Sequence, residues 1–189
     1  MGNKMRKFIS IFAITTIAVV LMFTITACVS IDTPVLVEGT TPSTEAANDA
    51  TTSDAPGTFE VGQTAELNDI QVCLVEVIES TGTQFSKPAD GNVFVLCEFE
   101  IANNSDEELN VSSVMSFEAY CDGYSCNYSF GALMAKGDKE QLDGTVAPGK
   151  KMNGVIGYEV PTDWKDLEVH FAPDVFSDKE FVFVATNDQ

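Results

Sequence analysis

The sequence has few basic residues and a strong excess of acidic ones. Its 189 residues include 10 lysines and arginines against 29 aspartates and glutamates, and the formal net charge is −19. Nucleic acid binding requires a basic surface that displaces counterions from the phosphates. The composition therefore excludes nucleic acid as a partner and allows cationic ligands or basic proteins. An acidic surface also keeps a domain hydrated and apart from its copies, which predicts a monomer.

Residue types for catalysis or metal binding are also scarce. His170 is the only histidine, and it alternates with Val169 and Phe171, which indicates a strand and a surface imidazole that is either exposed or locally hydrogen-bonded. A nucleophilic serine or cysteine needs a base beside it, and the cysteine spacing is not that of a zinc site. The acidic run 106–108 does not follow the spacing of an EF-hand. The sequence thus predicts a non-enzymatic protein with no metal and no cofactor.

What the sequence does contain begins with an export signal. Basic residues within positions 4–7 precede an uncharged, mostly apolar run at 8–25, and Ala27 stands directly before Cys28. This order is typical of a secretory signal, and a cysteine directly after the small residue resembles the lipobox of bacterial lipoproteins. Residues 1–27 are therefore predicted to be a signal peptide. Cys28 is predicted to carry the lipid, such as palmitate, that anchors the protein.

An uncleaved transmembrane helix is the alternative for the same segment, because the apolar run is near the minimum length that spans a bilayer. In both cases the basic start stays in the cytoplasm and the rest of the chain lies on the extracellular face of the cell membrane. Removal of residues 1–27 changes the net charge from −19 to −22, because that segment holds three basic residues and no acidic ones.

The segment after the cysteine has the composition of a tether. Residues 29–57 contain six threonines, three serines and three prolines without a sustained apolar period. Such a segment buries too little apolar surface to offset its loss of conformational entropy. Residues 28–57 are therefore predicted to be a disordered tether, and we do not expect the short apolar run at 35–37 to pack.

Residues 58–189 are predicted to form one all-β domain. Apolar and polar residues alternate clearly over 92–103, as expected of a half-buried strand. Further alternating segments are 70–75, 116–121, 152–160, 166–171 and 180–185. Helical periodicity is missing, and residues 131–136 allow one helical turn at most. About seven to eight short strands separated by turn residues predict an antiparallel β-sandwich, with a small closed β-barrel as the alternative.

Several turns and strands together resemble a known family. The segments that carry the resemblance are Lys87–Phe94, Ile101–Glu108, Pro148–Lys150 and Gly154–Pro161. They resemble an uncharacterised family of extracellular immunoglobulin-like domains from lipoproteins of Gram-positive bacteria, which is similar to a small secreted mycobacterial antigen. The resemblance covers roughly residues 58–185. It implies an immunoglobulin-like (Ig-like) sandwich outside the cell, and it implies no catalytic residues.

Four cysteines remain for the domain, and export favours disulfides. Cys121 and Cys126 flank a predicted hairpin tip, where a disulfide would clamp the turn. Cys73 and Cys97 lie opposite each other if residue 78 pairs with residue 92 in an antiparallel register. If their strands belong to different sheets, both can still point into the core, and two buried free thiols are a further alternative. The sequence leaves all three pairings of the four cysteines open.

Two surfaces are candidates for binding. The predicted loop 79–91 is long for a hairpin connection, and long loops often have a function. It carries Phe85 and Lys87. The second candidate is an aromatic set around the hairpin, which consists of Phe117, Tyr120, Tyr124, Tyr128 and Phe130. From these sets, the expected binding surface consists of Phe85, Lys87, Tyr120, Tyr124 and Tyr128.

These observations predict a lipid-anchored extracellular lipoprotein whose Ig-like domain binds or contacts another molecule. Its partners are the membrane, through the N-terminal lipid, and an extracellular protein or carbohydrate. A carboxylate-based extracellular hydrolase or a calcium-dependent sugar-binding module is the alternative, and either one requires carboxylates that converge in a cleft. A third hypothesis is an accessory or structural subunit of the cell envelope.

Overall fold

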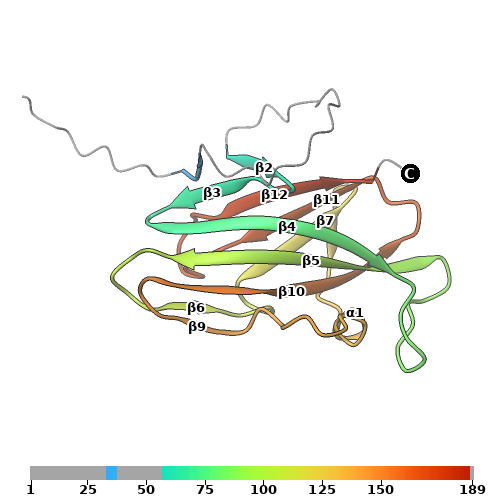
Figure 1. Cartoon of the computed structure of the whole chain (residues 1–189). Helices are drawn as coiled ribbons and strands as arrows, with labels where there is room; N and C mark the ends of the chain where they lie inside the picture. The colour runs from blue at the N-terminus through green and yellow to red at the C-terminus, as the bar shows by residue number, and fades with distance from the viewer. Residues whose placement is uncertain (1–32, 38–56, 188–189) are drawn as a thin grey trace, which may run out of the picture. The chain divides into compact units, whose positions relative to one another are not determined.

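The computed structural model describes residues 33–37 and 57–187. These residues form two packed five-stranded sheets and a small two-stranded one (Figure 1). Sheet 1 contains, in spatial order, β1 (Val35–Leu36), β3 (Thr64–Leu67), β4 (Ile70–Ser80), β5 (Asn92–Asn103) and β10 (Lys150–Pro161). Sheet 2 contains β2 (Thr58–Glu60), β12 (Phe181–Thr186), β11 (Asp166–Phe171), β7 (Phe117–Cys121) and β8 (Tyr124–Cys126). The small sheet pairs β6 (Leu109–Val111) with β9 (Gly144–Val146).

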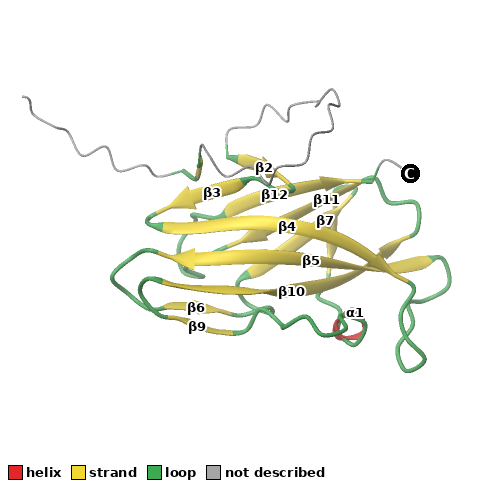
Figure 2. Ribbon diagram, in the orientation of Figure 1, coloured by secondary structure: helices red, strands yellow, loops and turns green. Residues whose placement is uncertain are grey.

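The β-sandwich prediction is confirmed, and the sheets do not close into a barrel (Figure 2). In the described ranges, seven strands have four or more residues, and five shorter strands lie beside them. All strand pairs there are antiparallel except β2 with β12, which pair in parallel. Strand β2 lies near the start of the domain and β12 lies at its end. No hairpin joins them, so the two strands can run in the same direction.

The core lies between the two sheets and is rich in aromatic rings. Phe99 from β5 contacts Phe117 and Phe183 of sheet 2, with ring centroids 5.4 and 5.6 Å apart. Phe117 is therefore a core residue, 7% exposed, and is not part of the surface set that the sequence suggested. Trp164 is also buried, and its indole N–H donates to Oε1 of Glu79 at 2.7 Å.

Strand β5 is buried on both faces. Val93, Val95 and the alternate residues that follow them face the main core, as the period-2 pattern predicts. Phe94 and Leu96 point the other way and are covered by a single helical turn, α1 (Phe130–Leu133). This turn is the only helix in the part of the chain that the structure describes.

Helix α1 packs tightly because of one glycine. Ser129 caps its N-terminus by accepting a hydrogen bond from the backbone N–H of Ala132 at 3.1 Å. A Cβ atom at Gly157 of β10 would lie 2.7 Å from the Cβ of Ala132. Because Gly157 has no side chain, the helix can lie directly on the outer face of sheet 1.

The β4–β5 register differs from the one that would pair the first two cysteines. Ile78 lies opposite Leu96 rather than residue 92, and a bulge between Leu74 and Glu76 shifts the ladder by one residue. As a result Cys73 lies opposite Glu100, and Cys97 lies opposite Val77. The register that would place Cys73 opposite Cys97 is therefore wrong. The two side chains also lie on different faces of sheet 1. Cys97 faces the main core, as Val72 and Leu74 of β4 do, whereas Cys73 lies between Val72 and Leu74 along the strand and points away from that core.

Strand β1 lies within the segment for which the sequence predicts a tether. Val35 and Leu36 pair with Glu66 and Ala65 of β3, and the backbone N–H of Val37 donates to the carbonyl of Thr64 at 2.8 Å. This short strand was not expected from the sequence. Both of its side chains remain largely exposed, at 39% and 51%, so backbone hydrogen bonds hold it rather than apolar burial.

The predicted signal peptide, Cys28 and most of the predicted tether lie outside the described residues. In the described ranges, no helix has the length and apolar character needed to cross a membrane.

Candidate functional site

A groove with aromatic walls lies at one end of the sandwich, between the β7–β8 hairpin and α1. We call it the hairpin groove. It is lined by Cys121, Asp122, Tyr124, Ser125, Cys126, Asn127, Tyr128, Ser129, Phe130, Glu159 and Pro161.

The first wall of the groove is a tight hairpin. Asp122 and Gly123 form its two-residue turn with φ angles of +49° and +79°, the conformation that this kind of hairpin requires. The Asp122 carboxylate accepts hydrogen bonds from the backbone N–H groups of Lys165 and Asp166 at 3.0 and 2.9 Å. The turn is therefore fixed to β11 and holds Tyr124 in place beside it.

The chain crosses from sheet 2 to sheet 1 directly after this hairpin. Tyr128 forms an isolated antiparallel bridge with Tyr158 of β10, and the backbone N–H of Ser129 donates to the carbonyl of Gly157 at 2.7 Å. Helix α1 then begins and forms the second wall. The groove is thus built where one segment joins the two sheets.

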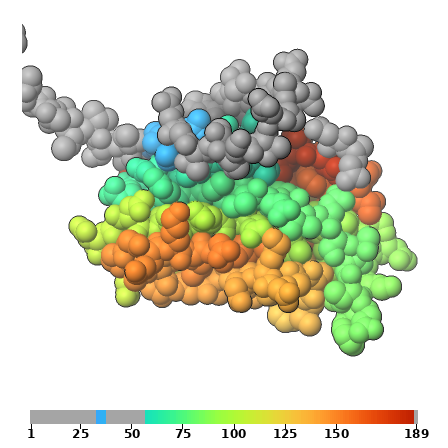
Figure 3. All heavy atoms as spheres, in the orientation of Figure 1, coloured from blue at the N-terminus to red at the C-terminus, as the bar shows by residue number. Residues whose placement is uncertain are grey.

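The loop between β4 and β5 lies next to this site. The Ser86 hydroxyl donates to the carbonyl of Gly131 at 2.9 Å, which connects the loop to α1. The Glu159 carboxylate accepts hydrogen bonds from the Ala89 backbone N–H and the Asn92 side chain at 2.8 and 2.9 Å. Figure 3 shows the loop as the green projection at the lower right. It brings Phe85 to the same end of the molecule.

Four large apolar side chains are exposed at this end. Phe85 is 83% exposed, Tyr124 80%, Phe130 67% and Met134 53%. We call these four residues the aromatic end. Such exposure is unusual for aromatic residues and is typical of contact surfaces.

The predicted binding residues do not all meet at one place. Tyr124 and Tyr128 line the hairpin groove, and Phe85 and Lys87 lie on the neighbouring loop. Tyr120 points to the outer face of sheet 2, away from the hairpin groove. Local sequence patterns indicated neither Glu159, which lines the groove from the distant strand β10, nor Met134, which is exposed directly after α1.

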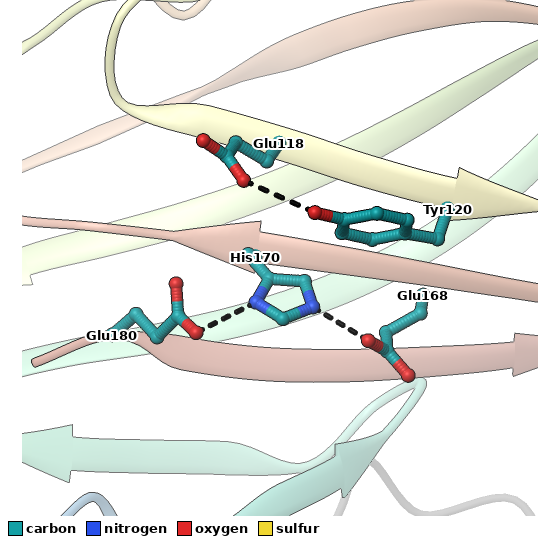
Figure 4. Close-up of polar contacts among 5 residues, drawn as sticks. All are labelled: Glu118, Tyr120, Glu168, His170 and Glu180. Carbon is teal, nitrogen blue, oxygen red and sulfur yellow. Dashed lines mark hydrogen bonds and ion pairs between the residues drawn. The ribbon is translucent and has the colours of Figure 1, made fainter. Parts of the chain in front are cut away.

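Tyr120 belongs to a separate polar cluster on the outer face of sheet 2 (Figure 4). Its ring meets the His170 ring edge to face with centroids 5.5 Å apart, and its hydroxyl donates to Glu118 at 3.4 Å. His170 lies between two carboxylates, with Nε2 2.6 Å from Glu168 and Nδ1 2.8 Å from Glu180. The prediction of a locally hydrogen-bonded histidine is confirmed.

The carboxylates control the charge of this histidine. Burial of the ring opposes protonation, but the hydrogen bonds and charges of Glu168 and Glu180 outweigh burial and raise the pKa of His170 above 6.5. Both ring nitrogens are engaged by carboxylates rather than by a serine or cysteine. This arrangement favours a structural imidazolium rather than a general base.

A second groove lies at the opposite end of the sandwich. Its walls include Glu107 and Glu108 from the β5–β6 connection and Asp174, Val175 and Phe176 from the β11–β12 loop. We call it the acidic groove. In the described part of the chain, no group of three or more histidine, cysteine, aspartate and glutamate residues is arranged to hold a metal ion.

Fold and site together define a β-sandwich domain with a groove of aromatic walls at one end. The chain belongs to the family described as a domain of unknown function, DUF4352, whose model matches residues 59–181. No protein among the curated sequences matches this chain.

The solved structures that share the fold include two proteins of Bacillus subtilis. A candidate lipoprotein, ycdA, of Bacillus subtilis has a TM-score of 0.55 and 17% sequence identity over 65% of this chain. That match covers 38% of the ycdA chain, so this protein corresponds to less than half of it. The yjhA protein of Bacillus subtilis has a TM-score of 0.51 and 16% identity, over 66% of this chain and 97% of its own. At these identities the comparisons establish the fold alone.

Proposed function

We propose that this protein is a lipoprotein held by Cys28 on the extracellular face of the cell membrane, where its Ig-like domain binds another protein through the hairpin groove. The lipobox-like sequence at residues 25–28 supports the anchor. The similarity in fold to a candidate lipoprotein of Bacillus subtilis is consistent with it. The relationship to Gram-positive lipoproteins and to a small secreted mycobacterial antigen is part of this proposal.

The observation that carries the binding function is the aromatic end. Protein interfaces are enriched in aromatic residues and methionine, surrounded by a polar rim. Here Phe85, Tyr124, Phe130 and Met134 are exposed around a groove whose polar lining includes Asp122 and Glu159. The hydrogen bonds of Asp122 and Glu159 fix the walls before any partner arrives, which limits the entropy lost on binding.

Charge restricts the kind of partner. The chain without residues 1–27 has a net charge of −22, so a basic partner is attracted and an acidic one is repelled. We therefore expect a protein that places an apolar side chain in the groove and basic side chains around it. The acidic groove gathers Glu107, Glu108 and Asp174, which is the kind of cleft that the hydrolase and the calcium-dependent sugar binder require, but no group of acids in the described residues is arranged to hold a metal ion. The hydrolase therefore stays the alternative, and the aromatic end carries the proposal.

A photo-reactive phenylalanine analogue at position 130 of the full-length lipoprotein tests this function in the cells that produce it. Crosslinking should yield a discrete, saturable, protease-sensitive product that decreases when Tyr124→Ser is added. The matched control carries the same analogue at position 176, which is exposed at the opposite end. A product that forms equally from position 176, or one that resists protease and is removed by glycosidases, would contradict a protein partner at the groove.

A further inference from the structure

Two of the four domain cysteines, Cys121 and Cys126, line the hairpin groove, and a third, Cys97, lies in the main core. Cys121 lies opposite Tyr124 in the β7–β8 ladder, and Cys126 lies opposite Ala119. Because Tyr124 and Cys126 are two residues apart on one strand, Cys121 and Cys126 point to the same face of the hairpin. After burial, the neighbouring Cys126 thiol is the next cause that raises the pKa of Cys121. The sequence predicts a disulfide between these two cysteines, and the structure shows both as free thiols.

The structure adds a third thiol from the facing sheet. Cys97 of β5 points into the core and is completely buried. Its partner on β10 is Ile156, two residues from Tyr158, and Tyr158 is bridged to Tyr128, two residues after Cys126. Cys126 thus packs against the core beside Cys97, and the two thiols interact electrostatically. Cys126 therefore has one neighbouring thiol on its own hairpin and another on the opposite sheet.

A buried hydroxyl without a hydrogen-bond partner lies in the same place. The Tyr158 hydroxyl is the only buried side-chain oxygen or nitrogen in the described residues that lacks a hydrogen bond. It interacts electrostatically with Cys97 and Cys126. A buried hydroxyl without a partner is costly and calls for an explanation. No sulfur in the described residues lies in hydrogen-bond contact with it, so a thiolate of Cys97 or Cys126 would have to move toward the hydroxyl during disulfide exchange to accept its hydrogen bond.

Cys73 provides the contrast within the same domain. It lies on the other face of sheet 1, opposite Glu100 and Thr64, and none of the other three thiols interacts with it. All four cysteines are free thiols in the structure. Any reactivity that depends on neighbouring thiols is therefore confined to Cys97, Cys121 and Cys126.

We propose that Cys97, Cys121 and Cys126 form a thiol–disulfide exchange site, in which Cys126 pairs either with Cys121 on its own hairpin or with Cys97 on the facing sheet. The first pairing clamps β8 within sheet 2, and the second ties β8 to sheet 1. The proposal does not depend on the groove having a protein partner.

The chemistry requires an external disulfide, RSSR, as the oxidant. The Cys126 thiolate attacks RSSR and releases RS⁻, and the Cys121 thiolate then displaces the second RS⁻ from the mixed disulfide. Two protein thiols lose two electrons and two protons, and one RSSR becomes two RSH. Attack of the Cys97 thiolate on the Cys126 sulfur next moves the disulfide to Cys97 and returns Cys121 to the thiol, without net oxidation.

Burial sets the speed of these steps. Burial is the main cause that raises the pKa of both Cys97 and Cys121 to about 12, and it also raises the pKa of Cys126. Because the thiolate is the nucleophile, exchange is slow at neutral pH and accelerates as the pH rises. The site is therefore suited to a disulfide that changes slowly.

Disulfide mapping of the full-length lipoprotein tests the proposal. The protein is purified from membranes in detergent and equilibrated in buffers of graded oxidised and reduced glutathione. It is then quenched in acid and alkylated, and its peptides are identified by mass spectrometry. We expect Cys121–Cys126 as the major disulfide, Cys97–Cys126 as a minor one, and Cys73 as a free thiol at moderate oxidation. In Cys121→Ser the Cys97–Cys126 disulfide should become the major form, at least tenfold above its wild-type share.

Cys73→Ser is the matched control and should leave both disulfides unchanged. If Cys126 forms no disulfide at any glutathione ratio, or pairs as often with Cys73, the site does not exist. If Cys121→Ser leaves Cys97 and Cys126 free, the exchange between sheets is wrong. The wild-type disulfide map alone decides whether Cys126 forms a disulfide and with which cysteine. The test therefore remains valid even if the Cys121→Ser variant folds poorly.

Discussion

The two ends of the sandwich both expose apolar side chains, but they hold them in different ways. At the aromatic end, Tyr124 lies on a strand, Phe130 begins a helix, and Phe85 lies on a loop bonded to that helix. At the acidic groove, Val175 and Phe176 lie on the connection between β11 and β12, where Phe176 is 97% exposed. Exposure alone therefore does not distinguish the two ends.

The difference between them is the amount of supporting structure. The walls of the hairpin groove are fixed by hydrogen bonds to β11, to β10 and to the β4–β5 loop. The loop at the acidic groove contains its own turn, in which the Phe176 backbone N–H donates to Asp174 at 3.0 Å, while the Phe176 side chain is 97% exposed. A site that is fixed in advance loses less entropy on binding, which is why we assign the binding function to the aromatic end.

The largest expected effect comes from removal of the ring beneath α1. Phe94 is 1% exposed and packs with Leu133 and Leu96. Phe94→Ala should lower the free energy of unfolding by about 3–5 kcal/mol, measured by chemical denaturation. It should also reduce crosslinking from position 130 far more than from position 176. Equal losses at both ends would show that α1 does not specifically support the aromatic end.

A smaller effect is expected where α1 meets β10. In Gly157→Val the new side chain would collide with Ala132, because even a Cβ would lie 2.7 Å from the Cβ of that residue. We expect a destabilisation of about 1–3 kcal/mol and faster amide exchange in residues 129–135. Gly157→Ala combined with Ala132→Gly should recover much of the loss. If the combined variant is no more stable than Gly157→Val, the close contact is not the cause.

Much of the sandwich could be predicted from local patterns. The alternation over 92–103 matches β5 residue for residue, and the helical turn expected near 131–136 occurs one residue earlier. The run from Val93 to Cys97 is apolar at every position, so neither face of the strand is polar there. This pattern indicates a strand that is covered on both faces. What covers the outer face could not be deduced, since α1 comes from a segment more than 30 residues away.

The elements that the sequence did not predict depend on distant or ambiguous contacts. Val72 to Val75 is apolar on both faces of β4, so the alternation locates neither the bulge, which turns Cys73 to the outer face, nor the hairpin register that places Cys97 opposite Val77. Strand β1 has only two residues and gains its stability from the edge of β3, which lies about 30 residues later. The hairpin groove likewise depends on the bridge between Tyr128 and Tyr158, and no local spacing reveals that bridge.

A moderate effect is expected at the turn of the β7–β8 hairpin. Asp122→Ala removes the acceptor for the backbone N–H groups of Lys165 and Asp166, and it places alanine at a positive φ angle. We expect a loss of about 1–2 kcal/mol in the free energy of unfolding. Asp122→Asn keeps an acceptor and tolerates the angle, so it should lose less than half as much. Thermal denaturation of the two variants side by side measures the difference.

The smallest effect concerns His170, which connects β11 to the start of β12 near the acidic groove through Glu180. Because its pKa is raised in the folded protein, the stability that it contributes is fully present below pH 6.5 and is lost as the pH rises through the folded-state pKa. His170→Gln should therefore destabilise the protein by about 0.5–1 kcal/mol more at pH 5.5 than at pH 8.5. Denaturation of both proteins at the two pH values measures this difference. The opposite dependence on pH would mean that burial outweighs the two carboxylates. Crosslinking from position 130 should be unchanged in this variant, since the hairpin groove is held by other contacts.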